Sequence, residues 1–374
     1  MIRTFSLFVA AMLWWASMLH AQTIAVTEVQ NSLRPGPKQN DAFPSRVLFY
    51  SLPTGKPVGS VETVEYPSVT RAPDGDHFLI ASINIPQWAA GDKKTVISEF
   101  DPQAKKVIDT YQHPRSIGGG ASPLSFGVSE SPSSMQCTGG LVWLSTRDYG
   151  AKGEPGNGYI EGINWKTKKV VATLEQPAAQ EEISADFFAM GDHCVVIRYH
   201  QHDRSNHKTD AIVIWEGGKS EPVILPLPAD QWLTHVAVGK SELVAQVGTA
   251  PILLRIGLDS VKHRLLINDP VNAPQLREGG RYVAQLVYLN DLGLIVAAQT
   301  EGQGIDRVVL IDATTLKPRK AVELSRLIEG LRFEGGTLYG YAPLTSTIVE
   351  YDKNFKVRHE SQIGWRIIGF TTQP

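Results

Sequence analysis

The sequence predicts an all-β protein, a seven-bladed β-propeller closed by pairing of N-terminal strands with a C-terminal innermost strand. The first observation is a repeated hairpin: an apolar strand, a short polar turn that often carries Lys, and a second β-rich run. Its seven copies lie at 47–61, 96–111, 159–174, 211–227, 252–267, 307–324 and 347–361.

The second observation is a turn followed by a β-run, which precedes six of the hairpins, at 73–82, 138–146, 191–199, 239–247, 290–299 and 334–342. The third is that residues 24–30, ahead of the first hairpin, have no such partner, whereas residues 365–372 have no hairpin after them. A blade that takes strands from both chain ends would close a ring and protect the sheet edges. Two β-sandwiches are the alternative, but they would not explain the repeat.

Residues 1–21 are predicted to be a signal peptide. Arg3 precedes an apolar stretch at 5–19, which is shorter than the roughly 20 residues of a membrane-spanning helix, and Leu19-His20-Ala21 suits cleavage before Gln22. The expected mature chain, 22–374, is a single periplasmic or secreted domain without a membrane span. An uncleaved N-terminal anchor is the alternative.

Composition excludes one class of partner. The sequence has 36 Lys and Arg against 38 Asp and Glu, and no long basic run, so nucleic acid is not expected. Its two cysteines, Cys137 and Cys194, form either a disulfide, as an exported protein allows, or two buried free thiols.

Two segments carry a resemblance to a known group of proteins. PDGDHFLIAS (73–82) and LIDATTLKPRKAV (310–322) resemble the repeats of YVTN-type and WD-repeat-like propellers, in which a strand after a Pro-Asp-Gly turn accompanies a strand that ends in Asp-x-x-Thr. The YVTN tetrapeptide and a closing Trp-Asp dipeptide are absent. The resemblance implies the fold. Such propellers include binding modules, lactonases, lyases and dehydrogenase subunits, so it does not select an activity.

The loops predict a recognition surface on one face. Four connections between second and third strands are long, at 31–45, 84–94, 147–158 and 200–208, whereas the corresponding loops of the next three blades are short. Long loops on a rigid scaffold commonly serve recognition. Trp88, Tyr149 and Arg147 are the candidate anchors, because aromatic and Arg side chains dominate interface energies. Alternatively, these side chains cap their own loops.

A histidine cluster is the candidate metal site. His200, His202 and His207 lie within YHQHDRSNHKTD, and two histidines in alternation on a strand could bind zinc or copper, with a third from the following loop. The cofactor is otherwise unknown. The alternative is that these imidazoles are simply solvated.

The central channel is the second candidate site. The predicted innermost strands would carry Tyr66, Glu182, His235, Arg281, Arg332 and Arg366 toward the axis. The Arg side chains suit an anionic ligand, and His235 with Glu182 could form an acid–base pair beside Arg281 or Arg366 as oxyanion stabilisers. A water-filled channel whose charges balance one another is the alternative.

These features favour an exported recognition module that binds a small anionic ligand, a polymer or an envelope protein through its long-loop face. The Gly-x-Ser-x-Gly and His-Glu-x-x-His motifs are absent from the sequence, and so is a phosphate-binding P-loop. The alternative is a periplasmic or secreted enzyme, such as a lactonase, a lyase or a dehydrogenase subunit, with its active site at the channel mouth.

Overall fold

The computed structural model describes much of the chain between Gln22 and Thr372. The described residues are 22–29, 44–52, 54–64, 68–81, 95–117, 135–138, 140–149, 155–176, 183–190, 194–203, 206–216, 223–226, 233–239, 242–259, 264–302, 304–334, 337–363 and 367–372. The predicted signal peptide lies outside them. None of the helices within these ranges is long and apolar enough to cross a membrane.

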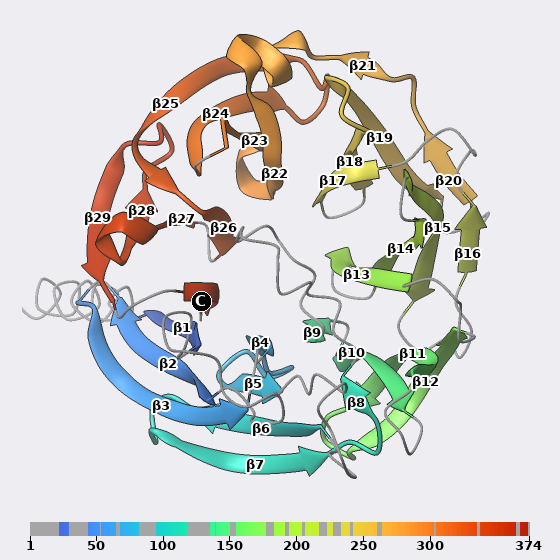
Figure 1. Cartoon of the computed structure of the whole chain (residues 1–374), viewed down its shortest axis with the longest axis vertical. Coiled ribbons are helices and arrows are strands. Elements are labelled where there is room, and N and C mark those ends of the chain that lie inside the picture. The colour runs from blue at the N-terminus through green and yellow to red at the C-terminus, as the bar shows by residue number, and fades with distance from the viewer. Residues whose placement is uncertain are drawn as a thin grey trace, which may run out of the picture.

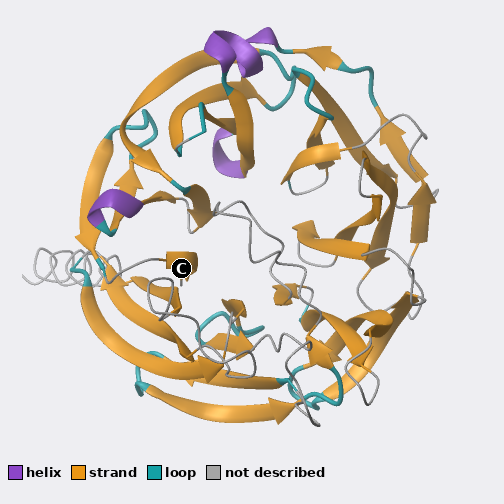
Figure 2. Ribbon diagram, viewed as in Figure 1, coloured by secondary structure: helices purple, strands orange, loops and turns teal. Residues whose placement is uncertain are grey.

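Strands make up nearly all of the described chain, joined by a few short 3-10 turns (Figure 2). They form separate antiparallel sheets around a common centre, here called A to G in chain order (Figure 1). Sheet A contains β1 (Gln22–Val29), β2 (Pro44–Leu52), β3 (Lys56–Val64) and β30 (Ile367–Thr372). Sheet B contains β4 (Ser68–Arg71), β5 (Phe78–Ala81), β6 (Val96–Asp101) and β7 (Lys106–Gln112).

Sheet C contains β8 (Ser116–Ile117), β9 (Met135–Thr138), β10 (Leu141–Tyr149), β11 (Pro155–Asn164) and β12 (Lys169–Gln176). Sheet D contains β13 (Ile183–Met190), β14 (Cys194–Asp203), β15 (Asn206–Glu216) and β16 (Val223–Pro226). Sheet E contains β17 (Leu233–Val238), β18 (Glu242–Val247), β19 (Ile252–Asp259), β20 (Arg264–Ile267) and β21 (Val271–Asn272).

Sheet F follows the 3-10 turn η2 (Pro274–Gly280). It contains β22 (Tyr282–Leu289), β23 (Leu294–Thr300), β24 (Ile305–Asp312) and β25 (Pro318–Ile328), with η3 (Asn290–Leu292) between its first two strands. Sheet G contains β26 (Gly330–Glu334), β27 (Thr337–Ala342), β28 (Thr347–Tyr351) and β29 (Val357–Gln362), with η4 (Pro343–Thr345) before β28.

The seven repeated hairpins of the sequence are antiparallel pairs in the structure, from β2 and β3 in sheet A to β28 and β29 in sheet G. The predicted pairing of the two chain ends is confirmed as well. β1 pairs with β30, with Ala25 opposite Thr371 and Val26 opposite Phe370. The last strand of the chain therefore covers the inner edge of β1.

The prediction of seven blades in a closed ring needs correction. Only five of the sheets in the described part of the chain, A, B, D, F and G, have the regular four-stranded order, so there are five regular blades and not seven. Sheets C and E have five strands each. Nor is any of them a closed sheet, because the β1–β30 pairing joins the chain ends within one open sheet.

The two irregular sheets have identifiable causes. In sheet E, β20 and β21 share one edge of β19, and Pro270 lies between them, where a residue without an N–H interrupts the ladder. In sheet C, β8 and β9 share one edge of β10. The innermost strand expected at 124–131 lies outside the described residues, and β9 occupies the inner position and contacts β4 and β13 of the neighbouring sheets.

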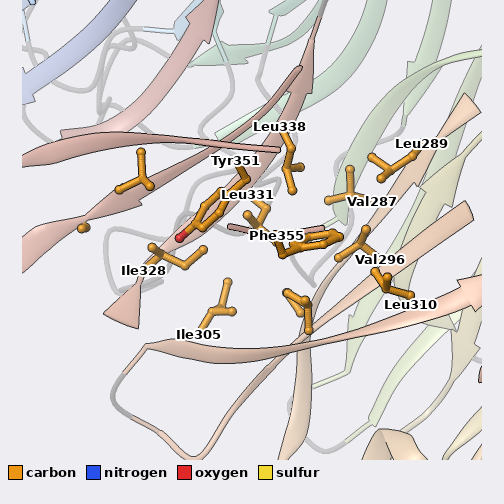
Figure 3. Packing of buried hydrophobic residues seen from close by; sticks show 14 residues of the cluster. Val287, Leu289, Val296, Ile305, Leu310, Ile328, Leu331, Leu338, Tyr351 and Phe355 are labelled. Carbon is orange, nitrogen blue, oxygen red and sulfur yellow. The ribbon is translucent and has the colours of Figure 1, made fainter. Parts of the chain in front are cut away.

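Apolar clusters join five pairs of neighbouring sheets in the described part of the chain. Figure 3 shows one of them, in which Val287, Val296 and Leu310 of sheet F pack against Leu331 and Tyr351 of sheet G. Similar clusters join sheets E and F, B and C, A and G, and A and B. Each fully buried aliphatic or aromatic side chain contributes roughly 1.5–3 kcal/mol. Packing between sheets, and not continuous hydrogen bonding, therefore holds the ring together.

One turn recurs at the end of the third strand and explains the sequence repeat. Asp101, Asn164, Asp312 and Asp352 each accept a backbone N–H from two to four residues further on. The same turns contain Lys105, Lys168, Leu316 and Phe355 in the left-handed region, with φ of 57°, 57°, 56° and 62°. Asp and Asn form such turns readily, since their short side chains bond to the local backbone.

Alternating strand direction divides the loops between two faces. The second-to-third connections and the connections between sheets lie on one face, here called the long-loop face, and the remaining turns lie on the opposite face. The expected long loops at 147–158 and 200–208 are shorter in the structure. β10 continues to Tyr149, β14 continues to Asp203 and β15 begins at Asn206, so most of the second loop is strand. The connections at 30–43 and 82–94 lie outside the described residues.

Candidate functional site

A polar network on the long-loop face centres on Arg115, in the connection from sheet B to sheet C. Its Nε donates to Asp148 Oδ1 at 3.1 Å and its Nη1 donates to Glu161 Oε1. The guanidinium also lies 3.8 Å from the centre of the Tyr159 ring, a cation–π contact. Arg115 therefore bridges the second and third strands of sheet C.

Glu161 is the buried anchor of this network, with 1% of its side chain exposed. Thr146 Oγ1 donates to its Oε2 at 2.6 Å, and His113 Nε2 lies 3.2 Å from the same oxygen. The Arg115 N–H donates to His113 Nδ1 at 3.1 Å, which assigns a ring hydrogen to Nε2, the nitrogen that faces Glu161. A buried carboxylate is stable only with such partners.

Glu161 is held in its ionised form. Burial raises the pKa of its carboxyl, but hydrogen bonds from His113 and Thr146 and the charge of Arg115 outweigh this effect, so the pKa lies below the ordinary 4.5. An ionised, fully bonded carboxylate is a poor proton donor at neutral pH. Glu161 therefore positions Arg115 and is not a general acid.

The outer part of the network is open to solvent. Asp148 is 48% exposed and Arg115 is 28% exposed. Tyr159 donates its phenolic hydrogen to Asp148 Oδ2 at 2.8 Å, and this hydrogen bond is the main reason that the pKa of Tyr159 is raised. Among the described residues, Arg115 Nη2 has no hydrogen-bond partner. The network thus presents a donor, an acceptor carboxylate and an aromatic ring side by side.

A second charged group on the same face surrounds Arg281, at the start of sheet F. Its guanidinium binds Asp306 through two hydrogen bonds, of 3.3 and 3.0 Å, and also pairs with Glu301 and Glu323. Arg307 pairs with Glu278 at 2.6 Å and with Glu323 at 3.5 Å. Four carboxylates accompany two guanidinium groups here, so this group carries excess negative charge and does not attract an anion.

On the opposite face, one group of the described residues has the composition of a metal site. Its members are Asp74, His77 and Glu99 in sheet B, whose nearest ligand atoms all lie within 4.8 Å of one another. These residues were not predicted as site residues from the sequence. The only signal was an Asp-Gly-Asp-His turn ahead of one strand, and Glu99 enters the group through strand pairing that no short motif reveals.

A cavity of about 480 Å³ lies between sheets E and F. Arg255, Asp269 and Thr314 are among its lining residues. The Arg255 guanidinium is already engaged, because it donates to the carbonyl oxygens of Ala313 and Thr314 and pairs with Glu242 at 3.2 Å. The cavity therefore offers no uncommitted positive charge to a ligand among its lining residues.

The structure describes the side chains of three predicted site residues. His235 is half-buried in β17, Arg281 directly precedes β22, and Arg332 is exposed in β26. They belong to three different sheets, E, F and G. The Arg281 side chain pairs with Asp306 of β24 and Glu323 of β25 in its own sheet. The prediction that it is a free cation at the channel axis is therefore wrong.

Five further residues are placed by backbone only. Arg147 and Tyr149 lie in β10, where they flank Asp148, and His200 and His202 lie in β14. The register sets His202 opposite His207 of β15, so the backbones of the three histidines are close in the sheet. The metal site itself remains a prediction, because their side chains are not described. Tyr66, Trp88, Glu182 and Arg366 lie outside the described residues.

The structure speaks against the disulfide alternative for the cysteines. Cys137 in β9 is a free thiol, and burial raises its pKa well above the ordinary value, so it is protonated and a weak nucleophile. The side chain of Cys194, in β14, lies outside the described part of the structure.

Comparison with solved structures identifies the architecture. A periplasmic gluconolactonase of Pseudomonas aeruginosa superposes with a TM-score of 0.57 at 11% identity, over 94% of this chain and 99% of that one. A proposed 6-phosphogluconolactonase of Bacteroides fragilis gives a TM-score of 0.58 at 11% identity, over 95% and 99%. This chain has the β-propeller fold.

The propeller domain of the Trilobed protease from Pyrococcus furiosus is similar too, with a TM-score of 0.53 at 10% identity over 91% of this chain and 92% of that one. Such low identities establish the propeller fold and no activity. No protein-family model matches the chain, and neither does any curated protein sequence. The resemblance to YVTN-type and WD-repeat-like propellers therefore stays a prediction.

Proposed function

We propose that this propeller is an exported recognition protein that binds a small hydroxylated carboxylic acid, or its lactone, at the Arg115 network. The observation that supports this is the combination of an anchored, partly exposed Arg115 with the half-exposed Asp148. Arg115 Nη2 would donate to a carboxylate or carbonyl oxygen of the ligand, and Asp148 would accept hydrogens from its hydroxyl groups.

The anchoring of Arg115 supports binding, because a side chain that is already ordered loses little conformational entropy when a ligand arrives. Glu161 fixes one end of the guanidinium and Tyr159 supports its face. The charges of Asp148 and Glu161 exceed the single positive charge of Arg115. A strongly anionic ligand is therefore disfavoured against a hydroxylated ligand with one acidic or carbonyl group.

Isothermal titration calorimetry with gluconate and glucono-1,5-lactone tests the proposal. We expect binding by the wild-type protein and a loss of roughly tenfold or more in affinity for Arg115→Met and Asp148→Asn, since each removes a charge-assisted hydrogen bond. Arg319→Met is the matched control, because Arg319 also pairs with a carboxylate, Asp312, but on the opposite face. Equal affinities for the wild type and Arg115→Met would refute the proposed site.

Lactone hydrolysis is the second candidate function. It is supported by two neighbours that are named as lactonases and that match almost the full length of this chain. The predicted acid–base pair would be His235 and Glu182, with Arg281 or Arg366 stabilising the oxyanion. Three carboxylates already surround Arg281, which favours Arg366 for that role.

A pH-stat assay with glucono-1,5-lactone separates the two functions. Hydrolysis that is abolished in His235→Ala and retained in Arg115→Met would establish the enzyme at the channel mouth. Binding of the lactone without turnover would support recognition alone.

A further inference from the structure

The Asp74–His77–Glu99 group, here called the His77 site, has two carboxylates around one imidazole, and a third carboxylate, Asp101, lies nearby. His77 Nδ1 lies 2.9 Å from Asp74 Oδ2 and 2.9 Å from Glu99 Oε1, while Nε2 lies 3.9 Å from Asp101 Oδ2. Asp74 and His77 come from the β4–β5 turn, and Glu99 comes from β6. Strands β5 and β6 pair in the ladder, with Phe78 opposite Phe100. The site is therefore fixed by the sheet itself.

Each carboxylate is oriented through its other oxygen. Asp74 Oδ1 accepts the backbone N–H groups of Asp76 and His77, at 3.0 and 3.3 Å. Glu99 Oε2 accepts the indole N–H of Trp165, at 2.5 Å, from the neighbouring sheet C. This leaves Asp74 Oδ2 and Glu99 Oε1 directed at the imidazole. Such outer hydrogen bonds orient the ligands of metal sites.

One N–H cannot satisfy both oxygens. Nδ1 carries at most one hydrogen, yet two carboxylate oxygens face it at the same 2.9 Å distance. At the tetrahedral angle that zinc prefers, two ligands that each lie about 2.0–2.1 Å from the ion are roughly 3.3 Å apart, so only a small shift from the 2.9 Å spacing is needed. The spacing thus suits a cation that is bound by both oxygens and the ring nitrogen.

Charge and access agree with this assignment. Asp74, Glu99 and Asp101 carry three negative charges. At most two positive charges oppose them: His77, when it is protonated, and Lys106, whose charge acts on Asp101. At least one negative charge is uncompensated. Asp74 is 45% exposed and His77 is 24% exposed, so an ion can enter and can keep water ligands.

We propose that Asp74 Oδ2, His77 Nδ1 and Glu99 Oε1 bind one divalent cation of the zinc class. One imidazole and two carboxylates are a donor set that zinc accepts, with water in its remaining position. Through Glu99 and Trp165, the ion would strengthen the contact between sheets B and C. This site lies on the opposite face from the Arg115 network and is independent of its function.

Titration calorimetry with ZnCl₂ tests the proposal. The variant His200→Ala/His202→Ala/His207→Ala serves as the background, so that binding by the other predicted histidine site is absent. We expect one Zn²⁺ per chain in this background, no binding at the site after adding His77→Ala, and affinity reduced roughly tenfold or more after adding Asp74→Asn. Asp74→Asn keeps the side-chain oxygen that caps the turn, so it tests the charge without removing the cap.

Asp352→Asn is the matched control, since Asp352 caps a comparable turn through Asn354 and Lys356 and belongs to no such group among the residues that the structure describes. Its zinc affinity should equal that of the background. Circular dichroism spectra confirm that each variant is folded. The proposal fails if the triple-histidine background binds no zinc, or if Asp74→Asn and His77→Ala bind it as tightly as that background does.

Discussion

Trp165 Nε1 donates a hydrogen bond to Glu99 Oε2 at 2.5 Å, across the boundary between sheets B and C. Both side chains are buried, and Glu99 also bonds to His77 within sheet B. The apolar cluster between sheets B and C has no such directionality. Together with the bond from the Cys137 N–H to Thr70 Oγ1 and the Lys168–Asp109 pair, this bond helps to fix how sheet C sits against sheet B.

Replacing Trp165 by Phe should lower the free energy of unfolding by about 1–3 kcal/mol, because Glu99 Oε2 would lose its donor while still buried. Urea denaturation of the two proteins measures this difference. In a Glu99→Gln background the same replacement should have a smaller effect, since a neutral amide is less costly to leave unpaired. Equal effects in both backgrounds would show that only the packing of the indole ring matters.

Glu161→Leu should be more severe, with a loss of about 3 kcal/mol, because removing one partner of a buried ion pair leaves the others without compensation. Arg115 keeps Asp148 and water access, which places the value at the lower end of the usual range. Asp148→Asn, which changes the exposed partner of the same Arg115, should cost far less. Similar losses in the two variants, measured by urea denaturation, would contradict the anchor role of Glu161.

Glu161 should also account for part of the loss of folding stability in acid. Its pKa is lower in the folded chain than its ordinary 4.5, so its stabilising contribution is complete above that value. As the pH falls below 4.5 and through the folded-state pKa, this contribution disappears. Unfolding free energies measured between pH 6 and pH 3 should therefore fall more steeply in the wild type than in Glu161→Gln.

His77 should produce the opposite dependence. Burial lowers its pKa, but the hydrogen bond that His77 donates to Glu99 and the charges of Asp74, Glu99 and Asp101 outweigh this effect, so the pKa is raised above 6.5. The stabilising charge is complete below 6.5 and is lost as the pH rises through the raised value. In metal-free buffer, the wild type should lose stability over that interval, whereas His77→Asn should not. A wild-type stability that is flat across the interval would contradict the charged pair.

Removing β30 by truncation after Ile363 should destabilise the whole propeller, because the inner edge of β1 would lose its partner and become an exposed edge. We expect a lower melting temperature and concentration-dependent aggregation, measured by circular dichroism and light scattering. Deleting Gln373 and Pro374 alone is the control. A truncated chain that melts like the full chain would show that the terminal pairing does not stabilise the fold.

The ion pairs of the candidate sites could not be predicted from the sequence. His235, Arg281 and Arg332 were selected because they lie in or beside innermost strands, and the structure places them there. The pattern could not show that Arg281 is neutralised by Asp306, Glu301 and Glu323, since these residues lie on other strands of the sheet. Arg115 and Glu161 were missed for the same reason: their sequence separation of 46 residues is closed only by strand pairing.

The hairpins and their order could be predicted from the sequence, because alternating apolar residues and Asp- or Gly-containing turns act over a few neighbouring residues. The pairing of the two chain ends followed from a count of the repeats, which left one strand without a partner at each end. Only the tertiary structure decided which sheets are regular, how β8 with β9 and β20 with β21 share an edge, and which charges meet. Those outcomes depend on contacts between residues that are far apart in the chain. Short-range pattern contains no record of such contacts, and so the Arg115 network and the His77 site emerged only once the sheets were assembled.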